Sequence, residues 1–389
     1  MSTNNPSRKP DGRLLVRVLV LAPYPLDRAP SQRFRWEQYV DPLAHRGIYL
    51  EPSPFLDSQG MDVVHLPRAW RAKLFATLRG TQRRLSDAIR ARSYDLVLVH
   101  RESFPVGPAW FERVLGWLGV PYAFDFDDAI YLPVASDANR RLAWLKSAGK
   151  AKRVAAGASL VVAGNEHLSG WAGTYASRVT VIPTTVDTER YHVCERPPSE
   201  PLCVGWSGSP TTIVHLRLLE SVLRTLQRDR GIRIRVIGDA SYDMDGAVVT
   251  STEWRAATEV KDLSTIDIGV MPMPDDEWSR GKCGLKALQY MALGIPAVLS
   301  PVGVNREIAE GGAAMLASTE DEWLAALRAL IDDEVLRVRM GEAGRARVEE
   351  RYSVAVVTPV WERALREAAS VGNSDATQVH RKVNQEVKG

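Results

Sequence analysis

The chain has 389 residues, of which 45% are hydrophobic and 25% are charged. This length and composition allow two ordinary domains with buried cores and exclude a disordered or fibrous chain. The 50 Lys and Arg residues nearly balance the 47 Asp and Glu residues, so the charge gives no reason to expect nucleic acid as a partner. The three cysteines, at positions 194, 203 and 283, have no metal-ligand or Cys-x-x-Cys spacing, which is typical of a reducing cytoplasm.

No segment of the sequence predicts export or a membrane span. Residues 1–12 are polar and proline-bearing, lack the apolar segment of a signal peptide, and are expected to be a disordered lead-in. The apolar runs fall far below the roughly 20 residues that span a bilayer. We therefore expect a cytoplasmic protein, whose only membrane contact would be peripheral, at the inner membrane face.

The first half of the chain alternates apolar strands with stretches of helical period. The run from Leu14 to Ala22 is almost wholly apolar and ends in Pro-Tyr-Pro, which predicts a parallel strand buried on both faces. Further strands are predicted at residues 95–99, 122–126, 159–163 and 179–182. This alternation is typical of a doubly wound, Rossmann-like α/β sheet, and we assign it to an N-terminal domain at residues 13–195.

A polar, proline-bearing stretch from Glu195 to Pro201 interrupts the pattern, which restarts with a strand at 202–206. The second half has further predicted strands at 232–237, 266–271 and 297–300 and helices at 215–228, 285–293 and 320–332. We expect a second Rossmann-like domain at 196–355, a terminal helix at 356–370 and a disordered tail at 371–389. Two such domains facing each other would leave a central cleft at the carboxyl ends of their sheets.

The loop after the first strand predicts a site near the start of a helix. Ser31 could cap this helix, and Arg33 and Arg35 would lie in its first turn. Cations there oppose the helix dipole, so a nearby anion would explain them, and we take both as candidate acceptor contacts. The alternative is a pair of solvated surface arginines.

Three carboxylates, Asp125, Asp127 and Asp128, lie at the end of another predicted strand. Such crowding raises at least one pKa unless a cation or bound hydroxyls offset the charge, so this segment could bind an acceptor or supply a base. The alternatives are an N-cap by Asp127 or Asp128 and a metal-binding Asp-x-Asp signature, which we rank low. His100 and Arg101, also just after a strand, are expected to line the same cleft.

The second half contains two loops suited to phosphate. The glycine-rich loop from Gly205 to Pro210 leads into a helix, and small residues let backbone amides approach phosphate oxygens. A plain tight turn is the alternative. Arg280, Lys282 and Lys286 surround the start of a helix near Gly284. This cationic cluster beside a helix N-terminus is costly unless an anion binds, which predicts a diphosphate site.

The same segment resembles the donor site of glycosyltransferase family 4. Its Gly284-Leu285 and the following Gln-Tyr-Met-Ala-Leu-Gly-Ile-Pro at 289–296 are similar to the family's stretch within its E-x7-E motif. Residues 181–187, VIPTTVD, resemble the interdomain "VIPNGVD", and residues 301–307 resemble the "VGG-x-x-E" loop. The resemblance implies the GT-B fold, a terminal helix that returns to the first domain, and sugar transfer from a nucleotide diphosphate sugar to a hydroxyl acceptor with retention and without a metal or other cofactor.

The chain departs from the family at both glutamates, which fall at Gly281 and Gln289, and it lacks the Arg and Lys that many members place after the first strand of the second domain. The resemblance therefore implies a variant subgroup with relocated phosphate contacts. From the residues themselves, we take Lys282, Lys286, Asp127 and Asp128 as the candidate catalytic groups. The implied donor contacts, for UDP or GDP above all, are Gly208, Ser209, Arg280, Cys283, Gly284, Gln289 and Glu307. A non-catalytic nucleotide-sugar-binding protein is the alternative.

Residues 69–92 form a predicted helix that is rich in arginine and lysine. Trp70, Leu74, Leu78, Leu85 and Ile89 share one face of it. We expect this apolar face to pack on its own sheet with the arginines in water. The alternative is a membrane-surface helix that binds anionic lipid or a lipid-linked acceptor.

Overall fold

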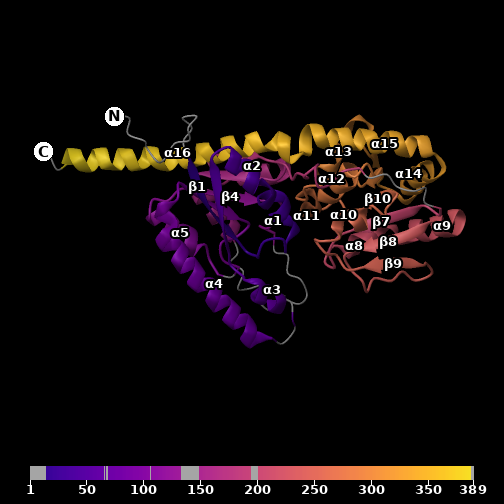
Figure 1. Ribbon diagram of the computed structural model, residues 1–389, viewed down its shortest axis with the longest axis horizontal. Coiled ribbons are helices and arrows are strands. Elements are labelled where there is room, and N and C mark those ends of the chain that lie inside the picture. The colour runs from indigo at the N-terminus through magenta and orange to yellow at the C-terminus, as the bar shows by residue number, and fades with distance from the viewer. Residues whose placement is uncertain are drawn as a thin grey trace. The chain divides into compact units, whose positions relative to one another are not determined.

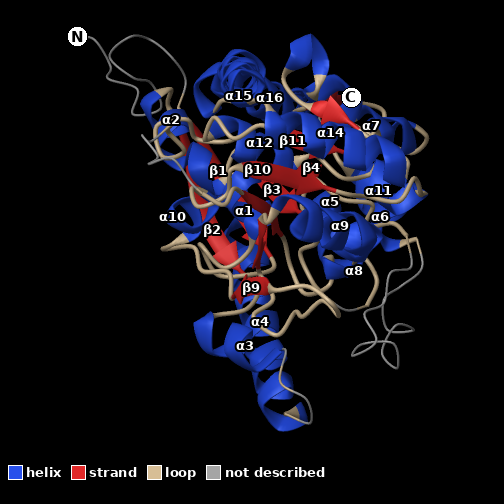
Figure 2. Ribbon diagram, turned by 90° about the vertical axis from the view of Figure 1, so that its right-hand side faces the viewer, coloured by secondary structure: helices blue, strands red, loops and turns tan. Residues whose placement is uncertain are grey.

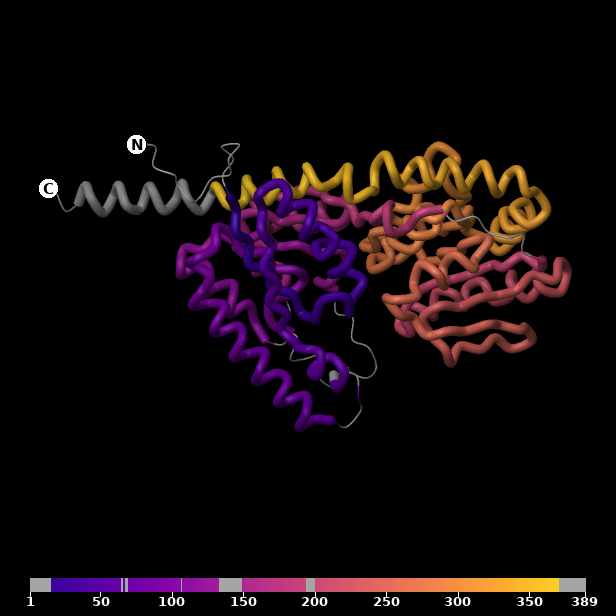
Figure 3. The backbone as a smooth tube through the Cα atoms, viewed as in Figure 1, coloured from indigo at the N-terminus to yellow at the C-terminus, as the bar shows by residue number. Residues whose placement is uncertain are grey.

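The computed structural model describes residues 15–64, 66, 69–105, 107–132, 149–193 and 200–386, with side chains as far as Ser370. The chain forms two compact units (Figure 1). Unit 1 comprises Met1–Pro183 and Thr358–Gly389, and unit 2 comprises Thr184–Val357. The path of the chain through each unit can be followed in Figure 3. The predicted lead-in at 1–12 lies outside the described residues.

Unit 1 is built on a parallel sheet of six strands in the order β2-β1-β3-β4-β5-β6. The strands are β1 Val16–Ala22, β2 Ile48–Pro54, β3 Leu96–His100, β4 Tyr122–Phe126, β5 Leu160–Ala163 and β6 Val179–Val181. All strands predicted for this half are present, and β2 is additional. Sequence reasoning missed β2 because Pro52 and Pro54 argue against a strand, although an edge strand tolerates them.

The strand order of unit 1 reverses beside β1. The chain passes from β1 to β2 on one side and then to β3 on the other side. Loops diverge at such a switch point and leave a crevice at the carboxyl ends of the strands, where open parallel sheets bind ligands. Side chains just after β1 and at the ends of β3 and β4 therefore lie at the ligand-binding edge of unit 1.

Helices fill the connections between these strands (Figure 2). The helices of this half are α1 Pro30–Arg35, α2 Val40–His45, α3 Ser58–Val64, α4 Trp70–Arg90, α5 Trp110–Trp117, α6 Lys150–Gly157 and α7 Glu166–Gly173. The last helix, α16 Val354–Glu386, enters unit 1 at Thr358. Trp361 is buried there, with its ring centroid 5.9 Å from that of Tyr39. Helix α16 runs on to Glu386, past residue 370, where we expected the terminal helix to end and a disordered tail to begin.

Unit 2 is a second parallel sheet of six strands, in the order β12-β11-β10-β7-β8-β9. Its strands are β7 Cys203–Ser207, β8 Arg233–Ile237, β9 Val249–Thr252, β10 Ile268–Met271, β11 Ala297–Leu299 and β12 Met315–Leu316. The four apolar strands were predicted. The two missed strands, β9 and β12, are the edges, where half-exposed segments need no apolar run.

The helices of unit 2 enclose a core around Trp206, Leu226 and Trp323. They are α8 Ile213–Leu216, α9 Glu220–Arg230, α10 Glu259–Leu263, α11 Glu277–Arg280, α12 Leu285–Ala292, α13 Asn305–Ile308, α14 Glu320–Asp332 and α15 Glu334–Arg347. Helix α14 has the bounds that its sequence predicts, because Thr319 and Glu322 form a capping box at its start. The predicted helix at 215–228 is instead divided between α8 and α9.

The division between the units falls at Pro183, before the predicted boundary at residue 195. The reason is that the intervening segment packs on unit 2. The hydroxyl of Tyr191 donates to Glu259 at 2.5 Å, and Arg345 donates to the carbonyl oxygen of Thr188 at 3.0 Å. The polar stretch at 194–199, which suggested the boundary, lies outside the described residues.

Helix α4 does not place its apolar face in the core, which corrects our expectation. The residues that it buries are Ala76, Gly80, Arg84 and Asp87. The large apolar residues that we expected to be buried are exposed instead, from 51% for Leu74 to 83% for Ile89. Among the described residues, no helix is both long and apolar enough to cross a bilayer.

Candidate functional site

The glycine-rich loop after β7 is tightly packed, and its backbone amides are not free to bind phosphate as we expected. The N–H of Gly208 donates to the carbonyl oxygen of Ile237 at 2.9 Å, and the N–H of Ser209 donates to the hydroxyl of Thr212 at 3.0 Å. A side chain at Gly208 would meet the ring of Trp206 at 2.2 Å. Packing therefore requires this glycine, and the two amides predicted as phosphate donors are already hydrogen-bonded within unit 2.

Two lysines near the start of α12 are held by tryptophan rings. The Nζ atom of Lys282 lies 3.6 Å from the ring centroid of Trp278, and that of Lys286 lies 5.3 Å from the ring centroid of Trp206. The negative face of each ring attracts the ammonium group and limits where it can move. Two like charges are thus kept beside the positive end of a helix, an arrangement that favours a bound anion.

His215, which the sequence did not single out, belongs to the same cluster. Its ring centroid lies 5.7 Å from that of Trp278, in an edge-to-face arrangement at 76°. Burial, and then the charges of Lys286 and Lys282, lower the pKa of His215 to about 4. The imidazole is therefore neutral at pH 7 and can donate or accept one hydrogen bond without adding charge. We missed it because it fell inside a predicted helix rather than in a loop.

Arg280, the third predicted member of the cationic cluster, pairs with an acid. Its Nε donates to Oδ1 of Asp275 at 2.7 Å, and its side chain is about half exposed. The carboxylate offsets the charge of the guanidinium. Lys282 and Lys286 are therefore the cations that the tryptophan rings hold near α12, and a part for Arg280 in phosphate binding stays a prediction.

Gly284 determines how the chain enters α12. Its φ of 70° lies in the left-handed region that favours glycine, and a Cβ there would lie 2.2 Å from Cδ1 of Ile308. The preceding Cys283 is half-buried, with its Sγ 3.9 Å from the carbonyl oxygen of Gly281. Both residues help to place the first turn of the helix, and a direct donor contact by either one stays a prediction.

The two polar residues expected to hold the ribose or sugar are hydrogen-bonded within unit 2. Gln289 is buried, and its amide donates to Tyr191 at 3.2 Å and to Glu259 at 3.0 Å. A ribose would have to displace these bonds, so the geometry favours a structural role for Gln289. Glu307 is exposed, and one of its carboxylate oxygens accepts a bond from the hydroxyl of Tyr352 at 2.9 Å.

At the carboxyl edge of unit 1, Asp125 bonds two side chains that we expected to contact an acceptor. Its Oδ1 accepts from Nε and Nη2 of Arg35 at 3.1 and 2.5 Å, and its Oδ2 lies 2.7 Å from Nδ1 of His100. Burial alone would raise the pKa of Asp125, but Arg35 and His100 outweigh it and hold the pKa below its usual range. The anion expected near Arg35 is thus a carboxylate of the chain, and Arg35 and His100 are buried.

The network continues to Ser31, whose Oγ lies 3.1 Å from Nε2 of His100. An ionised Asp125 can only accept, so a neutral His100 carries its proton on Nδ1 and accepts at Nε2. The hydroxyl of Ser31 then donates to His100, and its oxygen can accept a bond from a ligand. Ser31 is not the predicted cap, because α1 begins at Pro30 after Ala29.

Arg101 offsets the two other carboxylates. Its guanidinium nitrogens lie 3.5 Å from Asp127 and 3.8 Å from Asp128, whose side chains are mostly buried. Arg101 has a positive φ of 59°, a conformation that costs a non-glycine residue about 1 kcal/mol. Residues 129–132, the described part of the chain after Asp128, form a turn and not a helix, so the capping alternative, which placed a helix at 129–131, is wrong. Arg33, the remaining predicted acceptor contact, is also buried, with its Nε 3.9 Å from a carboxylate of the same loop.

The Asp-x-Asp pattern does not form a metal site in this geometry. Both oxygens of Asp125 already accept hydrogen bonds, and Asp127 faces the guanidinium of Arg101. Within the part of the chain that the structure describes, no group of three His, Cys, Asp or Glu side chains could hold a metal ion.

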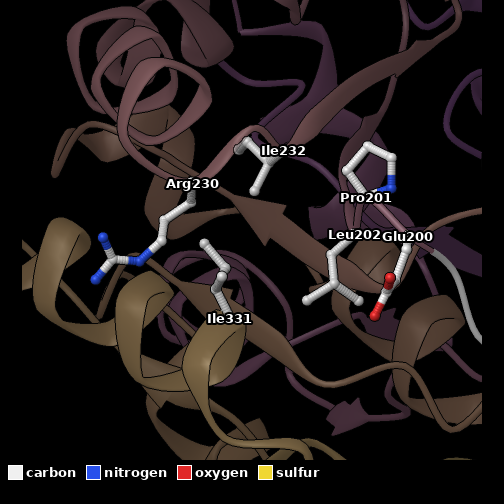
Figure 4. Close-up of a pocket in the computed structure, with 6 residues that line it drawn as sticks. All are labelled: Glu200, Pro201, Leu202, Arg230, Ile232 and Ile331. Atoms are coloured by element: carbon white, nitrogen blue, oxygen red, sulfur yellow. The ribbon is translucent and has the colours of Figure 1, made fainter.

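A pocket of about 510 Å³ lies elsewhere in unit 2 (Figure 4). Its lining residues are Glu200, Pro201, Leu202, Arg230, Ile232 and Ile331. Leu202 and Ile232 precede β7 and β8, so the pocket lies at the amino ends of the strands. Parallel sheets bind their ligands at the opposite edge, and Arg230 pairs with Asp332 at 2.9 Å, so we assign this pocket no role.

Comparison with known protein families gives a match within unit 2. Residues 202–333 match the family model of the glycosyl transferases group 1. These residues include His215, Trp278, Lys282 and Lys286. A search of curated proteins found no match.

Solved structures of glycosyltransferases match nearly the whole chain. Sucrose-phosphate synthase from Thermosynechococcus elongatus has a TM-score of 0.66 at 15% identity, over 92% of this chain and 100% of that one. Anabaena HepE, solved with UDP-glucose, has a TM-score of 0.63 at 15% identity, over 92% and 100%. Trehalose 6-phosphate synthase from Burkholderia multivorans has a TM-score of 0.59 at 14% identity, over 94% and 98%. The chain therefore has the α/β GT-B fold, and residues 202–333 of its second unit match the glycosyl transferases group 1 model.

Proposed function

We propose that this protein is a glycosyltransferase that moves a sugar from a nucleotide diphosphate sugar to a hydroxyl acceptor. The observation that carries this proposal is the cluster of Lys282 and Lys286 over their tryptophan rings, beside His215 and the start of α12. The match to the group 1 family covers this cluster. The cluster lies at the carboxyl edge of the parallel sheet of unit 2, where such sheets bind their ligands.

The lysines have a clear role in this chemistry. The bond between the anomeric carbon and the diphosphate oxygen breaks, and its electron pair leaves with the diphosphate. Lys282 and Lys286, held in place before the reaction, stabilise the charge that develops on the leaving group. Because two fixed cations supply this stabilisation, the proposal needs no metal ion, and the resemblance to family 4 favours retention of configuration at the anomeric carbon.

The acceptor side of the proposal lies in unit 1. The acceptor oxygen forms the new bond to the anomeric carbon, and its proton passes to an oxygen of the departing diphosphate. Asp127 and Asp128, partly exposed and charge-compensated by Arg101, are suited to orient the acceptor hydroxyl. The oxygen of Ser31 is a further candidate, because its hydroxyl donates a hydrogen bond to His100 and its lone pairs can accept one from the hydroxyl of a ligand.

A non-catalytic nucleotide-sugar-binding protein is the second candidate. It is favoured by Gln289, which replaces a family glutamate and is engaged in a buried network. This candidate shares the lysine cluster with the enzyme and differs from it only in turnover.

Nucleotide binding tests the part that both candidates share. The change in melting temperature is measured with UDP, GDP, ADP and TDP, each with and without EDTA. At about 100 times its Kd, the right nucleotide adds about 2.7 kcal/mol of stability, a rise of several degrees, and EDTA leaves the rise unchanged. UDP is the first choice, because HepE was solved with UDP-glucose. A rise that requires a divalent ion would contradict the metal-free site.

The control variants locate the binding. The double variant Lys282→Ala with Lys286→Ala should show no rise in melting temperature with the nucleotide. The variant Lys261→Ala, which replaces an exposed lysine of the same unit, should show the same rise as the wild type. An equal rise in melting temperature for the wild type and both variants would show that the nucleotide binds elsewhere.

A further inference from the structure

The outer face of α4 carries a stripe of large apolar side chains in water. Trp70, Leu74, Leu78, Leu85 and Ile89 recur at helical spacing on one side of the helix, with Phe75 beside them. Their exposed fractions are 64% for Trp70, 51% for Leu74, 65% for Phe75, 54% for Leu78, 53% for Leu85 and 83% for Ile89. Single exposed apolar residues are ordinary, but a contiguous row of them marks an interaction surface.

The opposite face of α4 shows why the stripe is not needed for the fold. Gly80 lets the helix approach the ring of Phe55 so closely that a Cβ would lie 2.6 Å from it. Arg84 is buried and bonds Asp87 at 2.8 Å, the carbonyl oxygen of Ser103 at 2.6 Å and that of Ala22 at 2.9 Å. Small residues and a buried ion pair thus attach α4 to unit 1, and the large apolar residues are left outside.

The exposed charges of α4 are all positive. Its one acid, Asp87, is buried and paired with Arg84 and Arg90. Arg79 and Arg83 lie 3.5 and 3.9 Å from Asp57.

Arg71 and Lys73 flank the exposed end of the stripe, and neither forms an ion pair with any residue that the structure describes. The Arg71 guanidinium lies 5.1 Å from the ring centroid of Trp70. Cations around an apolar stripe that begins with tryptophan complement a bilayer whose headgroups are negative. Two copies of this face would instead oppose like charges.

We infer that α4 is a docking surface for an anionic lipid bilayer. The helix lies in the plane of the interface, with the stripe among the acyl chains near the headgroups and Arg71 and Lys73 against lipid phosphates. This inference is independent of the proposed transferase activity, because none of its residues belongs to the lysine cluster or to the Asp125 network.

Vesicle co-sedimentation tests the inference with the whole protein. The vesicles are phosphatidylcholine alone or with about 30% phosphatidylglycerol, at low and high salt. The wild-type protein should bind the anionic vesicles about tenfold or more tightly than the neutral ones, and high salt should weaken this binding. No sedimentation with anionic vesicles at low salt, or equal binding to both kinds, would overturn the inference.

Matched variants separate the stripe from the charges. The triple variant Leu74→Gln, Leu78→Gln and Leu85→Gln should lose binding about tenfold or more, whereas Val335→Gln with Val338→Gln, two exposed apolar residues of α15, should bind as the wild type does. Arg71→Gln with Lys73→Gln should bind several times more weakly, with Arg339→Gln as the control.

Circular dichroism and light scattering complete the test. All variants should keep the wild-type spectrum, because none of the substituted side chains is buried. Wild-type binding by the triple variant would overturn the inference. A second result would also overturn it: the wild type is a dimer that does not bind vesicles, and the triple variant is a monomer. The stripe would then be the contact surface for a second copy of the chain.

Discussion

Asp125 lies buried between Arg35 and His100 and bonds both of them. A buried carboxylate is stable in its ionised form only with such partners, and a buried guanidinium likewise needs its carboxylate. In the neutral form of His100, the network places the ring proton on Nδ1 and makes the Ser31 hydroxyl the donor to Nε2. At the scale of single residues, the position of one charge decides what a neighbouring hydroxyl can offer to a ligand.

The variant Asp125→Asn should destabilise unit 1 by about 3–5 kcal/mol at pH 7, because Arg35 would be left as a buried cation without its anion. The pKa of Asp125 is lowered in the folded chain, so its stabilisation is fully present above the unfolded pKa of about 3.9 and is lost as the pH falls through the folded pKa. Urea unfolding from pH 8 to pH 3 measures the difference.

The exposed Asp245→Asn serves as the control and should change the free energy of unfolding by less than about 0.5 kcal/mol. A similar small change for Asp125→Asn, or a difference from the wild type that grows as the pH falls below about 4, would contradict this view of the network.

His215 gives a second prediction, concerning protons. Its pKa of about 4 leaves it neutral at pH 5.5, and a diphosphate bound by Lys282 and Lys286 should raise that pKa toward the ordinary value of about 6.5. Binding of UDP-glucose, whose diphosphate does not titrate in this range, should therefore take up protons. Calorimetry in buffers of different ionisation enthalpy measures this uptake at pH 5.5.

The uptake should disappear in His215→Asn and persist in His192→Asn, which replaces an exposed histidine of the same unit. If UDP-glucose binds the wild type with no change in proton number, the diphosphate does not lie near His215.

At the scale of elements, the segments with the strongest pattern were the ones that could be predicted. The central strands of both sheets are mainly apolar, as expected of parallel strands covered on both faces. Three edge strands, β2, β9 and β12, were missed because half-exposed segments mix polar residues and prolines. The outward face of α4 could not be predicted, because a helical stripe shows the direction of its apolar side chains but not what covers them.

Gly284→Ala tests the entry into α12. The variant should cost about 2–4 kcal/mol, because alanine is strained at a φ of 70° and its Cβ would meet Ile308 at 2.2 Å. The control is Gly311→Ala, which has a φ of 72° but open space around the added Cβ, so it should cost only the strain of about 1–2 kcal/mol. Urea unfolding measures both, and equal costs would show that the contact with Ile308 adds nothing.

At the scale of the molecule, the two-unit GT-B fold followed from the alternation of strands and helices and from the family resemblance. The lysine cluster was predicted in part. Lys282 and Lys286 stood out as charges near a helix start, whereas His215 comes from helix α8, about 60 residues earlier in the chain, and joins them and Trp278 of helix α11 only through folding. The predicted backbone donors at Gly208 and Ser209 could not be judged from sequence, because their hydrogen-bond partners depend on the packing of neighbouring loops.

The most direct test of the central claim is turnover of nucleotide sugars by the wild type, Lys286→Ala and Lys261→Ala. Release of nucleoside diphosphate is followed by mass spectrometry over a panel of UDP-sugars and GDP-sugars, with cell extract as the source of acceptors. The wild type and Lys261→Ala should turn over the same donor at equal rates, and Lys286→Ala should be slower by about 10² or more at saturating donor. Turnover by Lys286→Ala at the wild-type rate, or no turnover of any donor by the wild type, would contradict the proposed function.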